Sequence, residues 1–216
     1  MLEPGDRRGG PSGPPGPRVR RIALTGGIAT GKSWVRARFE DLGVPTIDSD
    51  VLAREAVAIG TPGLAAVVTR FGREMLLPSG ALDRQKLAQV VFANPDARRA
   101  LEAIIHPEVR RATDQWFASL DPQSHSWALA DIPLLYETGR DRDFNAIIVV
   151  ACDPETQVQR IIARDGLLEQ DARQRVAAQL PIAAKLAKAD YVIRTDGTLD
   201  DTDEQVRQVW KALSAG

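Results

Sequence analysis

The sequence predicts an α/β fold in which helices flank a central parallel sheet. Strand-like and helix-like segments alternate along the chain, and a glycine-rich turn joins the first strand to the first helix. The predicted strands are short apolar runs bounded by polar or turn residues, which is typical of parallel strands buried on both faces. Alternation of this kind favours an open parallel sheet.

Length and composition exclude several classes of protein. The chain has 216 residues, of which 44% are hydrophobic and 26% charged, the usual balance of a globular protein. Its formal net charge of −1 gives no strong field for nucleic acid or an anionic membrane. No apolar run approaches the roughly 18–20 residues that span a bilayer, and the single cysteine, Cys152, excludes an internal disulfide. We therefore expect a cytoplasmic protein with no nucleic-acid, membrane or obligate protein partner.

The core elements follow from short apolar runs and helix signals. The Gly/Pro-rich residues 1–18 cannot form a packed core, and we predict a disordered tail there. A strand over residues 21–24 leads through the glycine-rich turn into a helix over 33–42, which Gly43 can cap. The other predicted core elements are strands over 44–47, 127–129, 147–150 and 191–193 and a closing amphipathic helix over 200–213. The predicted core comprises residues 19–50, 127–153 and 183–216.

Two helical insertions interrupt this core. Residues 51–126 carry apolar stripes at helical spacing, and the stretch far exceeds the usual connection of about 2–6 residues. Within it, Asn94-Pro95 and His106-Pro107 each predict a new helix that begins at the proline. Residues 154–182 follow the fourth strand and predict a mobile, arginine-rich helical pair. The first insertion is long enough to form a subdomain.

The glycine-rich turn matches a phosphate-binding loop. Residues 26–33 read GGIATGKS, the full G-x-x-x-x-G-K-[ST] pattern, between a predicted strand and a predicted helix. Backbone N–H groups of such a loop hold nucleotide phosphates at the helix N-terminus. Lys32 can neutralise the β- and γ-phosphates, and the Ser33 hydroxyl can complete a Mg²⁺ shell. The predicted nucleotide-binding residues are Gly27, Ile28, Ala29, Thr30, Gly31, Lys32, Ser33 and Trp34.

The end of the second predicted strand carries two carboxylates. Asp48 and Asp50 are two residues apart, so both can point into the crevice where open α/β sheets bind ligands. Phosphoryl transfer needs a group that orients the attacking hydroxyl or takes its proton. Asp50 can serve in this way, but it can equally cap the helix that follows, and the spacing leaves both roles open. Because the chain lacks the guanine-reading motif N-K-x-D, an adenine nucleotide is expected.

Seven ordered stretches of the chain match the motifs of one known family. They are LTGGIATGKS at 24–33, IDSDVLAREAV at 47–57, LDRQKLAQVVFANP at 82–95, LEAIIHPEVR at 101–110, IPLLYE at 132–137, PETQVQRIIARDG at 154–166 and QLPIAAKLAKADYVI at 179–193. The phosphate-binding loop occurs in many families, whereas the ordered combination with D-x-D, HP, PLL-x-E and K-x-x-x-A-D-Y-V-I is specific. In this combination the chain resembles the dephospho-coenzyme A kinase family.

The resemblance implies an activity and an architecture. The activity is phosphorylation by ATP, with Mg²⁺, of the 3′-hydroxyl of the ribose in dephospho-CoA, the last step of CoA synthesis. The architecture is a P-loop kinase core with a central parallel sheet flanked by helices, an inserted helical CoA-binding domain at 51–126 and a helical lid at 154–182.

The resemblance also implies roles for individual residues. Asp50 becomes the catalytic base beside Lys32, with Asp48 as a supporting group for the substrate. Arg160 and Arg164 become lid contacts to the transferring phosphoryl group, Arg160 in a catalytic role. Arg54 and His106 become acceptor contacts. Ser33 is the expected Mg²⁺ contact, ahead of Asp131, which ends the third strand and resembles a Walker B acid.

Three positions depart from the usual family pattern. A glycine is replaced by Ala29, which is harmless only if that position needs no positive φ. A threonine is replaced by Trp34, which can crowd the nucleotide or pack on its base. An asparagine after the last strand is replaced within Arg194-Thr195-Asp196-Gly197, which leaves the adenine-side contact there open.

Two other functions remain as alternatives. Another P-loop kinase, acting on a small molecule or a nucleoside monophosphate, would need a much shorter acceptor-binding insertion than residues 51–126. A non-catalytic ATP-binding switch would not need Asp50.

Overall fold

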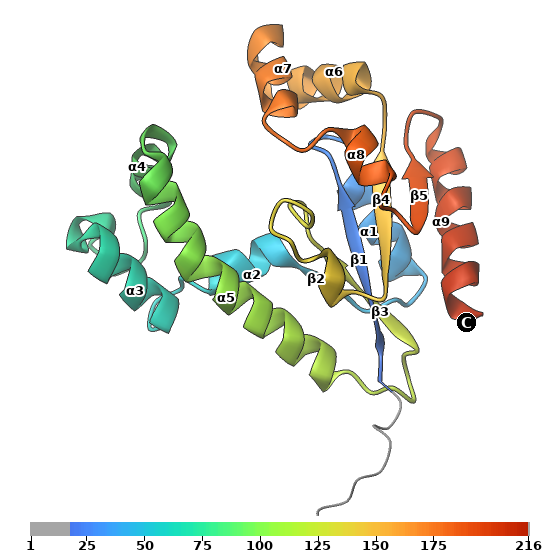
Figure 1. Ribbon diagram of the computed structural model, residues 1–216, viewed down its shortest axis with the longest axis horizontal. Helices are drawn as coiled ribbons and strands as arrows, with labels where there is room; N and C mark the ends of the chain where they lie inside the picture. Colours follow the sequence, from blue (N-terminus) through green and yellow to red (C-terminus); the bar gives the residue numbers. More distant parts are fainter. Residues whose placement is uncertain (1–17, 216) are drawn as a thin grey trace, which may run out of the picture.

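The computed structural model describes residues 18–215, so the predicted tail at 1–18 lies, except for Arg18, outside the described residues. Five strands form one sheet in the order β2-β3-β1-β4-β5, and every neighbouring pair is parallel. The strands are β1 (Arg20–Gly26), β2 (Thr46–Asp48), β3 (Trp127–Asp131), β4 (Ala146–Ala151) and β5 (Tyr191–Arg194) (Figure 1). The predicted parallel α/β fold is confirmed.

Helices cover both faces of the sheet. On one face, α1 (Lys32–Asp41) and α9 (Leu199–Ser214) pack through Phe39 and Val206 against Leu24 and Ile148. On the other face, the end of α5 (Pro95–Ser119) and the short α8 (Ile182–Leu186) pack on the alanine- and valine-rich sides of the central strands. Residues of β3 are buried throughout, as expected for a parallel strand covered on two sides.

All five strands differ from their predicted bounds by one or two residues, and two of these differences affect the edge of the sheet at the site. β2 begins at Thr46 rather than at residue 44, because Pro45 has no N–H to donate, although its carbonyl accepts from the Leu129 amide at 2.9 Å. β3 continues to Asp131, two residues beyond the predicted end, through pairing with both β1 and β2. The carboxyl ends of these strands therefore meet at one edge of the sheet.

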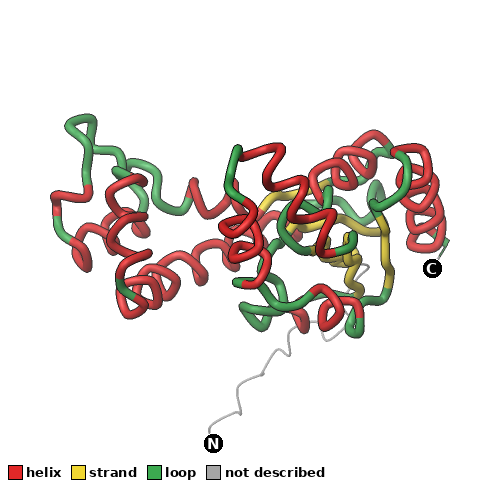
Figure 2. The backbone as a smooth tube through the Cα atoms, turned by 90° about the horizontal axis from the view of Figure 1, so that it is seen from above, coloured by secondary structure: helices red, strands yellow, loops and turns green. Residues whose placement is uncertain are grey.

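The helices between β2 and β3 form a separate packed unit. They are α2 (Ser49–Glu55), α3 (Pro62–Phe71), the 3₁₀ turn η1 (Arg73–Met75), α4 (Arg84–Ala93) and α5. Their own apolar cluster contains Val67, which is fully buried, together with Leu64, Met75 and Leu87. Seen from above, this unit extends away from the sheet (Figure 2).

The prediction of a new helix at His106-Pro107 is wrong. α5 is one helix of 25 residues with Pro107 inside it. An internal proline removes one backbone hydrogen bond and normally costs about 3 kcal/mol. The helix continues because both halves are anchored, the first against the cluster around Val67 and the second against the sheet through Phe117.

The predicted helical pair after β4 is present as α6 (Pro154–Asp165) and α7 (Glu169–Ala177). Val158, Ile161 and Ala172 are buried between them, and Ile28 and Ala29 of the glycine-rich loop pack against this group. A short 3₁₀ turn, η2 (Asp141–Asp143), lies between β3 and β4.

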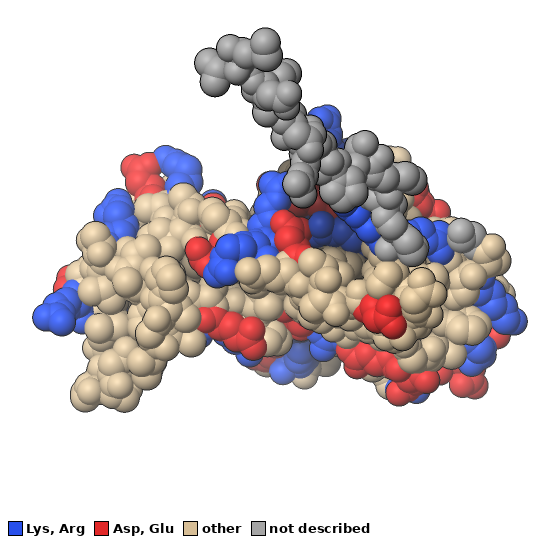
Figure 3. All heavy atoms as spheres, turned by 90° about the horizontal axis from the view of Figure 1, so that it is seen from below, with Lys and Arg blue, Asp and Glu red and all other residues tan. Residues whose placement is uncertain are grey.

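Within residues 18–215, no helix is both long and apolar enough to cross a membrane. On the face shown in Figure 3, basic and acidic side chains both occur across the molecule.

Candidate active site

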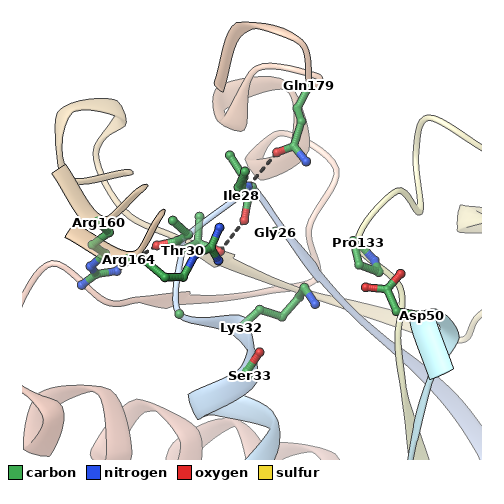
Figure 4. A pocket seen from close by; sticks show the side chains of 13 residues that line it. Gly26, Ile28, Thr30, Lys32, Ser33, Asp50, Pro133, Arg160, Arg164 and Gln179 are labelled. Carbon is green, nitrogen blue, oxygen red and sulfur yellow. Dashed lines mark hydrogen bonds between the residues drawn. The ribbon is translucent and has the colours of Figure 1, made fainter. Parts of the chain in front are cut away.

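The glycine-rich loop between β1 and α1 borders a cavity of about 480 Å³ (Figure 4). Residues 26–33 line it, and four other segments contribute Asp50 from α2, Pro133 after β3, Arg160 and Arg164 from α6, and Gln179 after α7. The fold thus brings the predicted loop, Lys32, Asp50 and both lid arginines to one place. These groups, from Gly26 to Arg164, are up to 138 residues apart in sequence.

Close contacts explain the glycines at the start of the loop. A β-carbon on Gly26 would lie 2.5 Å from the Val150 carbonyl oxygen, and one on Gly27 would lie 2.4 Å from the Gln157 side-chain nitrogen. Neither approach is possible for a larger residue without displacement of the neighbour. The loop therefore runs directly over the end of β4 and against α6.

Ala29 does need a positive φ. Its φ is +58°, in the left-handed region, so the condition for a harmless replacement of glycine is not met. A residue with a β-carbon is disfavoured there by about 1–2 kcal/mol. The Ala29 methyl packs on the apolar group of α6 and α7, and this burial offsets part of the strain.

Lys32 is held by a buried carboxylate. Its ammonium forms an ion pair with Asp131, which is 2% exposed at the end of β3. Burial raises the pKa of Asp131, although the charge of Lys32 acts in the opposite direction. In Figure 4 the Lys32 side chain extends toward the side of the cavity where Asp50 and Pro133 lie. Asp131 therefore positions the Lys32 side chain.

The two carboxylates of the IDSD run have different environments. Asp48 is the N-cap of α2, and its Oδ1 accepts from the Asp50 amide at 2.8 Å, while its Oδ2 pairs with Arg36. Partial burial acts to raise the pKa of Asp48, but the hydrogen bond from Arg36 and the one from the Asp50 amide together hold it below its ordinary value. Asp50 lines the cavity with its carboxylate directed inward (Figure 4). The helix cap is therefore Asp48, not Asp50.

The two arginines predicted to belong to a lid, Arg160 and Arg164, differ in their partners. Arg160 donates to the Thr195 carbonyl at 2.6 Å, to the Thr195 hydroxyl at 3.0 Å and to the Ala29 carbonyl at 3.3 Å. It pairs with no carboxylate among the residues described, so its charge is not neutralised there. Arg164 is exposed and forms an ion pair with Asp165 at 2.7 Å.

Thr195 belongs to the segment that departs from the family pattern. Its hydroxyl also donates to the Thr30 carbonyl at 2.7 Å. The replaced segment therefore holds both the phosphate-binding loop and Arg160.

A second cavity of about 150 Å³ adjoins the first. Asp50 and Pro133 line both cavities, and His106 from α5 lines the second, as expected for an acceptor contact. Its walls are mostly aliphatic: Ala53, Ile105, Val109, Ile132 and Leu134.

Arg140 also lines this second cavity, and the sequence analysis did not identify it. The residue is 8% exposed, and one of its terminal nitrogens has no hydrogen-bond partner within residues 18–215. Burial, the largest influence, lowers the pKa of Arg140, and its only carboxylate contact in that range is to Asp143 at 3.4 Å. No periodic pattern in the loop after β3 could have identified it.

Three predicted contact residues do not line either cavity. Asp48 faces Arg36, and Arg54 is exposed at the end of α2. The Trp34 indole donates to Asp203 on α9 at 2.9 Å, and the Arg38 guanidinium stacks on its ring. Arg36 was also missed, although its position four residues after Lys32 places it on the same face of α1.

Comparison with known proteins identifies the family. The model of the dephospho-CoA kinase family matches residues 20–201. A dephospho-CoA kinase from Anaeromyxobacter dehalogenans is 49% identical over 179 residues, 83% of this chain and 85% of that protein. The chain belongs to the dephospho-CoA kinase family.

Solved structures agree with this assignment. The protein TT1252 from Thermus thermophilus shares 33% identity at a TM-score of 0.76, covering 92% of this chain and 97% of that one. A dephospho-CoA kinase from Campylobacter jejuni shares 27% identity at a TM-score of 0.70, covering 91% of this chain and 98% of that one. The P-loop kinase fold is confirmed, and as a member of the dephospho-CoA kinase family the chain is a transferase that uses ATP to phosphorylate dephospho-CoA.

Proposed function

We propose that the junction of the two cavities is where this dephospho-CoA kinase family member transfers the γ-phosphoryl group of ATP to the 3′-hydroxyl of the acceptor ribose. The observation that carries this proposal is that Asp50 and Pro133 border both the phosphate-loop cavity and the cavity that contains His106. A donor on the loop and an acceptor beside α5 would meet at Asp50.

The donor side rests on the loop and on Lys32. Backbone N–H groups at the start of α1 bind the phosphates, and the helix N-terminus adds partial positive charge. Lys32, held by Asp131, neutralises charge on the β- and γ-phosphates. In this role the ion pair with Asp131 limits the number of positions that the Lys32 ammonium can take.

The acceptor side rests on Asp50. The ribose 3′-oxygen forms a bond to the γ-phosphorus, the bond from that phosphorus to the bridging oxygen of ADP breaks, and the hydroxyl proton passes to Asp50. Because Asp48 supplies the helix cap, the Asp50 carboxylate is available for this task. His106 and Arg140 contact the acceptor in the second cavity.

The lid contribution rests on Arg160. Its guanidinium lines the phosphate cavity and is hydrogen-bonded to neutral oxygens. A cation placed in this way stabilises the charge spread over the transferring phosphoryl oxygens. Arg164, on the same helix face, adds a second contact when the lid, residues 154–182, closes over the bound substrates.

The residues around the phosphate cavity fit Mg²⁺. Ser33 lines the cavity, and its hydroxyl has no hydrogen-bond partner in the described part of the chain, while Asp50 offers carboxylate oxygens on the same cavity. Mg²⁺ in kinases is held by few protein oxygens together with phosphates and water. When bound, it neutralises phosphate charge. We assign Ser33 as the direct contact.

Further assignments belong to the same proposal. Residues 51–126 are the CoA-binding domain, supported by their separate apolar cluster. We place the protein in the cytoplasm, which a single buried, unpaired cysteine supports.

An acceptor panel tests the proposal. Purified protein is given ATP and Mg²⁺ with dephospho-CoA, adenosine, AMP or shikimate, and ADP release is measured. We expect turnover with dephospho-CoA and little with the others. Equal or greater turnover with AMP or shikimate would contradict the acceptor assignment.

The Asp50→Asn variant tests the assigned base. Loss of a general base lowers kcat by about 10²- to 10⁴-fold, whereas ATP affinity should stay within about twofold, because Asp50 does not belong to the loop. Glu55→Gln, an exposed change on the same helix, is the matched control and should keep full kcat. An Asp50→Asn variant with full kcat would refute the role and favour an ATP-binding switch.

A further inference from the structure

A buried ion pair lies beneath the active-site loop and has no part in the chemistry described so far. Lys185 on α8 is fully buried, and its ammonium lies 2.8 Å from Glu137, which follows β3. The same nitrogen donates at 3.2 Å to the carbonyl of Gly26 and at 3.2 Å to that of Pro133. A buried charge that satisfies backbone carbonyls fixes the positions of those carbonyls.

The two carbonyls belong to the two sides of the reaction. Gly26 begins the phosphate-binding loop, and Pro133 borders both the phosphate cavity and the acceptor cavity. The Lys185 ammonium therefore connects the backbone of the donor side with the backbone of the acceptor side. Lys185 lies in the K-x-x-x-A-D-Y-V-I stretch and Glu137 in the PLL-x-E stretch, and neither side chain takes part in the proposed reaction steps.

Glu137 extends this connection to the end of the lid. The same carboxylate oxygen that meets Lys185 accepts from the Leu180 amide at 3.3 Å. Next to Leu180, the Gln179 side-chain oxygen accepts from the Ile28 amide of the loop at 2.6 Å (Figure 4). In the segment that leaves the lid, Leu180 is thus bound by the buried pair and Gln179 by the phosphate-binding loop.

The entry segment of the lid holds the same residue, Ile28, through its other backbone group. Gln157 on α6 is 3% exposed and donates to the Ile28 carbonyl at 2.7 Å. Ile28 is therefore bound on its carbonyl side by the chain that enters the lid and on its amide side by the chain that leaves it. A movement of either lid segment therefore acts on the backbone on one side of Ile28.

We propose that Gln179, held in place by the Lys185–Glu137 pair, is a positioning residue. It aligns the phosphate-binding loop with the lid and with the segment after β3 that contains Pro133. The proposal rests on the proposed transfer site and assigns no contact with the reacting atoms to these three residues.

Gln179→Leu is the first test, because it removes the acceptor of the Ile28 N–H and leaves the buried pair intact. We expect kcat to fall at least tenfold, the KM for dephospho-CoA to stay within about twofold, and hydrogen exchange at the Ile28 amide to become at least tenfold faster. Gln174→Leu, an exposed glutamine on α7, is the control and should change none of these. Unchanged kcat with faster exchange at Ile28 would overturn the positioning role.

The buried pair is tested through non-additivity. Lys185→Met should give the same kinetic and exchange signature, Lys185→Arg should restore at least part of the turnover, and Lys185→Met with Gln179→Leu should be little worse than either alone. If the fold-losses of kcat in the two single variants multiply in the double variant, Lys185 and Gln179 have separate roles and the proposal is overturned. If Lys185→Met does not fold, Glu137→Gln combined with Gln179→Leu gives the same comparison.

A failure of the proposed function can be distinguished from a failure of the positioning inference. Wild-type protein without turnover on dephospho-CoA would refute the function, whereas hydrogen exchange at Ile28 and the affinity for a fluorescent ATP analogue can still be measured in every variant. If these two readouts are unchanged in Gln179→Leu, the positioning inference is wrong, whatever the acceptor.

Discussion

At the residue scale, Asp48 and Asp50 show how neighbouring carboxylates acquire different roles. Asp48 caps α2 and pairs with Arg36, so both of its oxygens have protein partners. Asp50 lies two residues further along the chain and lines the cavity. The sequence spacing allowed either residue to cap the helix. The structure shows that α2 begins at Ser49, directly after β2, and this makes Asp48 the N-cap.

Arg140 carries a prediction at the same scale. Arg140 lines the second cavity, and Asp143 is the only carboxylate contact of its guanidinium within residues 18–215, so its positive charge is available to an anionic group of the acceptor. We expect Arg140→Met to raise the KM for dephospho-CoA by about tenfold, the loss of roughly one hydrogen bond to a charged donor, with the KM for ATP unchanged. Steady-state kinetics with each substrate varied in turn measure both values.

Arg142→Met is the matched control for this prediction. Arg142 lies two residues away, is exposed, and forms no ion pair with any described residue. A rise in the acceptor KM of the same size in both variants would show that the charge of the loop, rather than the cavity contact, is responsible.

At the element scale, α2 depends on the charge of its N-cap. The pKa of Asp48 lies below its ordinary value of 3.8 in the folded protein. A lowered folded pKa means that this contribution to stability is complete above about pH 4 and is lost as the pH falls through the folded value.

The Asp48→Asn variant isolates this charge, because asparagine is also a good N-cap. We expect the free energy of unfolding to fall less between neutral pH and about pH 3 in the variant than in wild type. Urea unfolding at both pH values measures the difference, with exposed Asp171→Asn on α7 as control. An identical pH dependence in wild type and Asp48→Asn would contradict the assigned pairing.

The long helix α5 shows where local signals fail at this scale. Asn94 caps it through its side chain, which accepts from the amides of Asp96 and Ala97, as its sequence predicts. His106-Pro107 carries an equally good start signal, yet the helix passes through it. Packing against two different cores outweighs the lost hydrogen bond, and no local pattern reports such packing.

At the scale of the whole molecule, the sheet edge, α2, α5 and α6 border the two adjoining cavities that we propose as the reaction site. Arg160 already touches the loop, whereas Arg164 and most of α7 are exposed. The lid assigned to residues 154–182 should therefore become more ordered when both substrates bind.

Hydrogen exchange checks this expectation. With a non-hydrolysable ATP analogue and dephospho-CoA, amides of α6 and α7 should exchange at least several-fold more slowly, while those of β1 and β4, already buried, should not change. Saturating binding of both ligands without any slowing in α6 and α7 would rule out lid closure.

The fold class, the phosphate-binding loop and the candidate residues Asp50, Lys32, Arg160 and His106 could all be predicted from the sequence alone. These depend on local patterns, on residue chemistry and on ordered motifs, all of which are readable along one chain. The folded structure was needed to show which aspartate caps α2, that Ala29 adopts a positive φ, and that Arg140 and the Lys185–Glu137 pair lie beside the two cavities. These features arise from contacts between segments distant in sequence, where burial and hydrogen-bond satisfaction, rather than local preference, select the arrangement.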